Sequence, residues 1–164
     1  MKTTENAVFA LMGLGACAAT VTTSFTAAYA IEALRSDDNW AGCSRDAFTW
    51  CWWACVHSCM SLMPVASAII RGIIGTGASV NVMTPVQATL KAVATFVLSL
   101  GGAIATEAQF ISQCSAGSKG STALEWYMWN NYGMSAWVFA MAILLYIDWR
   151  YSTSGELDGY TQEV

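Results

Sequence analysis

The sequence predicts an all-α membrane protein, a bundle of four transmembrane helices that run up, down, up and down and are joined by short loops. Of its 164 residues, 55% are hydrophobic and 11% are charged, whereas a soluble domain carries about 25% charged residues. Four apolar runs reach the roughly 20 residues that span a bilayer: residues 7–34, 49–70, 85–111 and 123–147. Hairpin connections between successive runs place both termini on one side. Residues 1–164 are therefore predicted to form a single integral membrane domain.

The first apolar run has two interpretations. The triplet "AYA", Ala28 to Ala30, follows an apolar stretch and has the pattern of a signal-peptidase site. In the segment "MKTTEN", however, Lys2 is balanced by Glu5, and the apolar run is longer than the ~7–15 residues of a signal sequence. We therefore expect the run to be retained as the first transmembrane helix.

The two loop cysteines, Cys43 and Cys114, lie on the side away from the termini. A disulfide between them requires an oxidising compartment, and the alternative is two unpaired thiols. We predict the bridge, which places the termini in the cytosol. The basic residues of the two sides are nearly balanced and do not decide the orientation. The loop side carries Arg35, Arg45 and Lys119, and the side of the termini carries Lys2, Arg71 and Arg150, with Lys91 about two turns into the third run. The sequence does not say which membrane holds the protein.

Three cysteines recur at intervals of four residues in the second run: Cys51, Cys55 and Cys59. On a helix they fall within about 80° of one another, and His57 falls roughly opposite. Thiolate ligands in hydrocarbon would carry buried charge, whereas thiols behave as small apolar side chains. We therefore expect a packing seam and no metal site.

Catalytic signatures are missing from the sequence. It contains no C-x-x-C pair, and its one histidine cannot form a bis-histidine haem site. Neither a Ser-His-Asp order nor an H-E-x-x-H motif is recognisable. A non-catalytic protein is predicted, with no cofactor other than bound lipids.

A polar stripe follows one face of the third run, within about 80°: Lys91, Thr95, Ser99, Gly102, Thr106 and Gln109. Such a stripe either packs against neighbouring helices through small residues and hydrogen bonds or lines a water path. Packing is the favoured interpretation. His57 should lie near mid-bilayer, where we expect a hydrogen bond across helices. Asn130 and Asn131 are candidate partners.

Three carboxylates lie near the extracytosolic interface: Glu32, Glu107 and Glu125. They could form a mouth that attracts cations. The favoured alternative is that each is solvated separately, with Arg35 or Lys119 as a partner.

Small residues dominate the first run between Gly13 and Ala30, "GLGACAATVTTSFTAAYA". Such residues let helices approach closely in lipid. Gly13, Gly15 and Cys17 are therefore candidate contacts with another copy or another subunit, together with the uncharged connection 72–82. The acidic tail after residue 147 is expected to be a surface strap or a flexible end.

The four-span layout with short loops resembles that of MARVEL-type and claudin-type membrane proteins. The segment "WAGC", Trp40 to Cys43, matches part of the claudin first-loop signature but lacks its Leu-Trp and its second cysteine. The resemblance is therefore one of layout, and it implies a role in organising membranes more than catalysis.

We predict a structural, assembly or scaffold subunit that packs laterally in a homo-oligomer or a larger membrane complex. The alternative is an oligomeric channel or transporter subunit with a polar path along residues 85–111, from Lys91 to Glu107. The expected partners are membrane lipids, further copies and other membrane subunits. A net charge of −4 argues against nucleic-acid binding.

Overall fold

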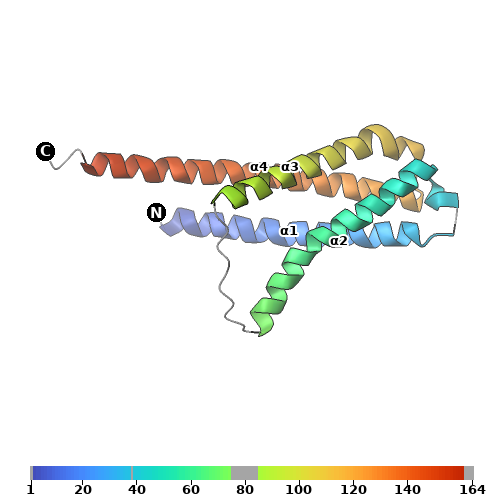
Figure 1. Ribbon diagram of the computed structural model, residues 1–164, viewed down its shortest axis with the longest axis horizontal. Coiled ribbons are helices and arrows are strands. Elements are labelled where there is room, and N and C mark those ends of the chain that lie inside the picture. The colour runs from blue at the N-terminus through green and yellow to red at the C-terminus, as the bar shows by residue number, and fades with distance from the viewer. Residues whose placement is uncertain (1, 38, 75–84, 161–164) are drawn as a thin grey trace.

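The computed structural model describes the backbone of residues 2–37, 39–74 and 85–160, and the side chains of residues 13–37, 39–63, 90, 92–144, 146 and 147. Its long helices are α1 (Lys2–Leu34), α2 (Arg45–Ile74), α3 (Pro85–Ala105) and α4 (Lys119–Tyr160). Successive helices run in opposite directions, so that α1 begins and α4 ends at the same end of the molecule (Figure 1). The predicted all-α bundle of four helices is confirmed.

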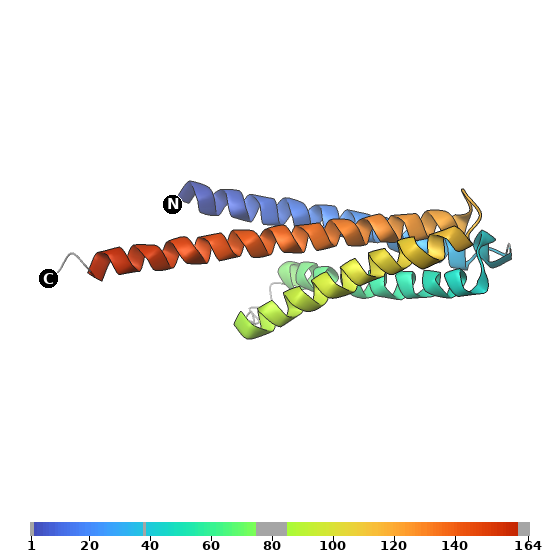
Figure 2. The same ribbon diagram turned by 90° about the horizontal axis from the view of Figure 1, so that it is seen from above.

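The four helices do not pack equally with one another. Helix α1 packs along α2 and along α4, and α3 packs along α4. Helix α2 also contacts α4. Among the described residues, no packed interface joins α2 to α3 itself, and α2 instead contacts the short helical turn that follows α3. The helices lie close together at the end with the short loops (Figures 1 and 2). Toward the other end, α2 leaves α1 and α4 in Figure 1, and α3 leaves α4 in Figure 2.

Two stretches of the described residues are long and apolar enough to cross a bilayer, Gly13–Leu34 in α1 and Ala92–Gln113 in and after α3. The core helix of a soluble protein can have the same hydropathy, but only 22% of each stretch is buried within this chain. Within the described residues, α2 and α4 contain no stretch of this kind. Two of the four predicted spans are therefore supported by hydropathy.

The predicted disulfide joins Cys43 and Cys114 at the end of the bundle away from the termini. Two backbone hydrogen bonds flank it, from Ser44 N to the Gln113 carbonyl (2.9 Å) and from Ser115 N to the Gly42 carbonyl (2.8 Å). The bridge closes this end over a small core of buried side chains: Cys43, Ala47, Cys51 and Leu124. We call this the disulfide end.

The predicted third helix does not run unbroken to residue 111. It begins at Pro85 as expected, but after Ala105 it widens into a π-helical turn, Thr106–Phe110, followed by a short 3-10 helix, Ile111–Gln113. The Trp50 indole N–H donates to Thr106 Oγ1 (2.8 Å), and the Trp50 ring stacks on Phe110 at 4.7 Å. A π turn inserts one extra residue and so changes the direction of the side chains that follow. Here it accompanies both contacts with α2.

The segment after residue 147 is helical as far as Tyr160, where α4 ends; the prediction of a surface strap or a flexible end stays untested. Of the connection 72–82, residues 72–74 are the last of α2, and the rest lies outside the described residues.

Candidate functional site

A polar cavity of about 110 Å³ lies where the four helices meet. Every helix contributes to its wall. None of the lining side chains is a carboxylate, a lysine or an arginine: they are Thr23 from α1, His57, Ser58 and Ser61 from α2, Thr95, Leu98 and Ser99 from α3, and Asn130, Asn131 and Met134 from α4. The cavity therefore offers hydroxyl, amide and imidazole groups without formal charge.

Small side chains on the inner face of α2 make room for this junction. Ala47, Cys51, Ala54 and Ser58 are all buried, and their spacing of four, three and four residues keeps them on one face of the helix. Toward the disulfide end these residues pack tightly. One turn beyond Ala54, the Ser58 side chain meets the cavity instead.

His57 is bonded to a tyrosine of α4. Its Nδ1 lies 3.0 Å from the Tyr127 hydroxyl, and Trp53 stacks parallel to the imidazole ring at 5.9 Å. Tyr127 is fully buried, and a Cβ at Gly102 would lie 3.0 Å from its hydroxyl oxygen, so a glycine leaves this oxygen its space. The sequence predicts a hydrogen bond from His57 across helices, but the partner is Tyr127 and neither asparagine. The missed signal is that Tyr127 shares a helix face with Asn131, four residues later.

We expect Tyr127→Phe to lower the free energy of unfolding by about 1–2 kcal/mol, because a buried hydrogen bond of His57 loses its partner. Thermal unfolding in detergent measures the change. Tyr132→Phe is the matched control, since the Tyr132 hydroxyl donates to the exposed Glu107, and its loss should matter little. Equal effects of the two substitutions would contradict the assignment.

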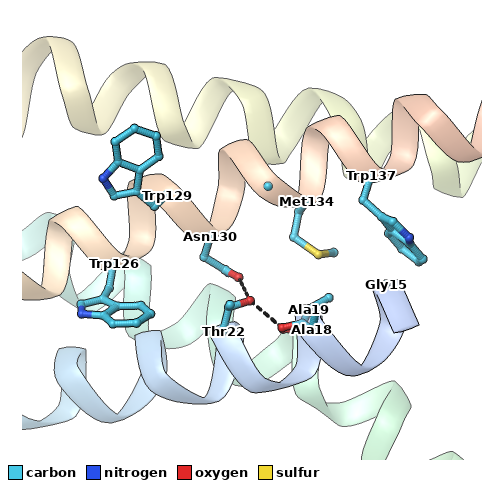
Figure 3. Close-up of a pocket in the computed structure, with 10 residues that line it drawn as sticks. Gly15, Ala18, Ala19, Thr22, Trp126, Trp129, Asn130, Met134 and Trp137 are labelled. Carbon is cyan, nitrogen blue, oxygen red and sulfur yellow. Dashed lines mark hydrogen bonds between the residues drawn. The ribbon is translucent and has the colours of Figure 1, made fainter. Parts of the chain in front are cut away.

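The two asparagines of α4 make different hydrogen bonds, one to α1 and one within α4. Asn130 Oδ1 lies 2.6 Å from the hydroxyl of Thr22 on α1, and the two side chains point toward each other across the helices (Figure 3). The Asn131 amide donates to the Tyr127 carbonyl (2.8 Å) within α4. Asn131 thereby remains at the cavity wall without a bond to His57.

An apolar groove of about 260 Å³ lies on the other side of Asn130 and Met134, between α1 and α4. Its α1 side consists of small residues, and its α4 side carries three tryptophans, Trp126, Trp129 and Trp137. Trp137 reaches toward Gly15 (Figure 3), so closely that a Cβ at Gly15 would overlap the indole ring. Gly15 is therefore a contact within the chain, while Gly13 has open space around it.

The polar stripe of the third run faces inward along its middle. Ser99 and Thr106 are buried, Thr95 lines the cavity, and Gly102 faces Tyr127. Gln109, after the π turn begins, is exposed. The Lys91 side chain lies outside the described residues.

The three carboxylates have separate partners. Glu32 pairs with Lys119 at 3.9 Å, and both side chains are more than half exposed. Glu125 accepts a hydrogen bond from the Ser121 hydroxyl (3.0 Å), and Glu107 accepts one from the Tyr132 hydroxyl. The arrangement matches the alternative in which each carboxylate is accommodated by itself.

The cysteine seam is shorter than the sequence suggests. Cys51 is buried, Cys55 is half-buried, and Cys59 and Cys17 are exposed. A spacing of four residues advances about 40° around a helix at each step, so each cysteine of α2 turns further from the interior than the one before. Within the described part of the chain, no group of three or more His, Cys, Asp or Glu side chains could hold a metal ion.

Comparisons of the chain with models of protein families, with curated proteins and with solved structures find no match.

Proposed function

We propose that this chain is a non-catalytic membrane protein with four spans and cytosolic termini, and that it acts as a structural subunit by packing laterally against a second copy of itself. Membrane lipids, and not a cofactor, are its expected bound molecules. The observation that carries the proposal is the uncovered side of the bundle between α2 and α3, which we call the α2–α3 flank.

The α2–α3 flank combines apolar and polar groups at the surface. Large apolar side chains are exposed on both of its helices: Val56, Met60 and Met63 on α2, and Leu90, Val93, Val97 and Leu98 on α3. Ser61 and Leu98 are exposed and also line the polar cavity. Lipid chains cover apolar side chains well, but they offer no hydrogen bonds to a polar group. A helix from another subunit covers both, and helix association in lipid depends on such packing and hydrogen bonding.

Packing also supports four spans, beyond the two that hydropathy indicates. Helix α4 packs along both α1 and α3, and α2 packs along α1. If α1 and α3 cross the membrane, α2 and α4 therefore lie at the same depth in it. Their tryptophans near the disulfide end, among them Trp52 and Trp129, are exposed. Tryptophan is enriched at membrane–water interfaces, so these residues suit a helix that starts at one.

Three glycines allow a test that leaves the single chain intact. Gly13 on α1, Gly101 on α3 and Gly133 on α4 are exposed, and a Cβ at each meets nothing within 4 Å. Leucine at any of them should raise helix stability by somewhat less than about 1 kcal/mol relative to glycine. We expect Gly101→Leu, beside the α2–α3 flank, to shift the native mass in lipid nanodiscs from a dimer toward the single chain.

Gly133→Leu, on the groove between α1 and α4, serves as the control and should keep the oligomeric mass. If only Gly13→Leu abolishes the oligomer, the interface between copies lies on α1 and not on the α2–α3 flank. A wild-type chain that runs as a monomer in nanodiscs would overturn the proposal.

A channel or transporter subunit is the second candidate, and the cavity at the four-helix junction is the observation that favours it. A polar path along α3 would need several subunits, because one four-helix bundle is a packed object. Fully buried Tyr127 also stands between the cavity and the disulfide end. Solute flux through vesicles that contain the wild-type chain would favour this function over assembly alone.

A further inference from the structure

We propose that the cavity at the four-helix junction is a binding site for water, which it holds as a small cluster anchored on the Ser58 hydroxyl. This inference does not depend on lateral assembly. It begins from Ser58 itself, which is 2% exposed and whose Oγ has no hydrogen-bond partner among the described residues.

Other hydroxyls of the bundle show how unusual this is. Inside helices, serine and threonine commonly bond back to the carbonyl four residues earlier. Thr26 does so with Thr22 (2.9 Å), and Ser135 does so with Asn131 (2.8 Å). Ser58 makes no such bond, although it is as deeply buried. A buried hydroxyl without a partner is costly, and a water molecule in the cavity that Ser58 lines would remove this cost.

The cavity has the size and chemistry that water needs. A water molecule takes about 30 Å³ in the liquid, so a cavity of about 110 Å³ has room for a few molecules. Cavities that stay dry are apolar. This wall instead carries buried hydroxyl and amide groups on all four helices: Thr23, Ser58, Ser99 and Asn131.

The same wall selects against ions. An ion that enters an uncharged cavity loses its hydration without gaining a counter-charge. A neutral molecule that both donates and accepts hydrogen bonds meets no such penalty. Exposed Ser61 also lines the cavity, so the cavity opens toward the α2–α3 flank.

The test uses hydroxyl radicals that X-rays generate from water, with the full chain in lipid nanodiscs. His57 lines the cavity and is the single histidine of the chain. Because its side chain is also partly exposed at the surface, the part of its oxidation that depends on Ser58 reports water at this site. Met128 is 8% exposed and does not line the cavity. Its oxidation rate therefore serves as the reference for a buried side chain of the same bundle without cavity water. We expect His57 to be oxidised several-fold faster than Met128, although methionine is the more reactive side chain.

Two variants separate bound water from general loosening. Ser58→Val fills part of the cavity and removes the hydroxyl, and it should lower the oxidation of His57 several-fold while Met128 stays unchanged. Ser135→Val is the matched control, since Ser135 is buried to a similar degree but already bonded to Asn131. His57 oxidation should persist in this control.

A conservative variant keeps the proposal testable if valine prevents folding. With water bound, Ser58→Ala loses hydrogen bonds and should lower the Tm. In a dry cavity the same change removes an unpartnered hydroxyl and should raise the Tm. A raised Tm of Ser58→Ala, or an oxidation rate of His57 that Ser58→Val leaves unchanged, would overturn the proposal.

Discussion

Replacing both Cys43 and Cys114 by serine will lower the free energy of unfolding by about 4 kcal/mol, the larger of the two strongest effects that we expect. The two cysteines are 71 residues apart, and cross-linking a chain over a loop of this length removes entropy worth roughly 4 kcal/mol from the unfolded state. Chemical unfolding in detergent, with and without a reducing agent, measures this effect.

Two controls distinguish the cross-link from cysteine chemistry in general. Cys17→Ser and Cys59→Ser alter exposed free thiols and should leave the stability unchanged. The reducing agent should destabilise the wild-type chain but not the double serine variant. If it leaves the wild-type chain unaffected, the bridge does not form in the protein as isolated.

Gly15→Leu is expected to lower the free energy of unfolding by about 1–3 kcal/mol, the usual cost of overpacking. A Cβ at Gly15 already overlaps the Trp137 indole, so a leucine must displace this ring or push α1 away from α4. Gly13→Leu is the control two residues earlier, where the added side chain meets open space. Thermal unfolding of the two variants gives the difference.

A double variant tests whether the contact with Trp137 is the cause. Trp137→Ala alone removes a half-buried indole and should destabilise the chain. Combined with Gly15→Leu it should cost clearly less than the sum of the two changes, because the leucine then occupies the vacated space. Additive losses would mean that Gly15 matters for some other reason.

The sequence predicts the architecture because the patterns that determine it can be read along the chain. The lengths of apolar runs and the low charge determine four helices, and short loops determine their alternating direction. The Cys43–Cys114 bridge follows from its position in the two loops on one side. Pro85 marks the start of α3, since proline suits the first helical position.

The lateral arrangement of the helices is not readable in this way. Periodicity tells which residues share a face of one helix, but it does not tell which neighbour that face meets. Gly15 is therefore read as a contact between copies, although it packs on Trp137 within the chain. The separation of α2 from α3 escapes prediction for the same reason.

The candidate site is only partly foreseen. Interior positions of Thr95, Ser99 and Thr106 agree with the polar stripe, and His57 does bond across helices. The cavity itself depends on how the four helices come together around it and on the orientation of the Ser58 side chain, and no sequence pattern predicts either. The π turn at Thr106–Phe110 likewise depends on Trp50 from another helix.

Helix α4 has 42 residues, which at ~1.5 Å per residue makes it about 63 Å long. This is twice the hydrocarbon thickness of ~30 Å that a span must cross. If the proposed span ends near residue 147 and the termini are cytosolic as proposed, the remaining turns of α4 form a helical stalk that extends roughly 20 Å from the membrane. A reporter fused after Tyr160 would therefore be held away from the membrane by this stalk. Because one added residue turns a helix by about 100°, each alanine inserted into the stalk would rotate the reporter by that angle around the helix axis.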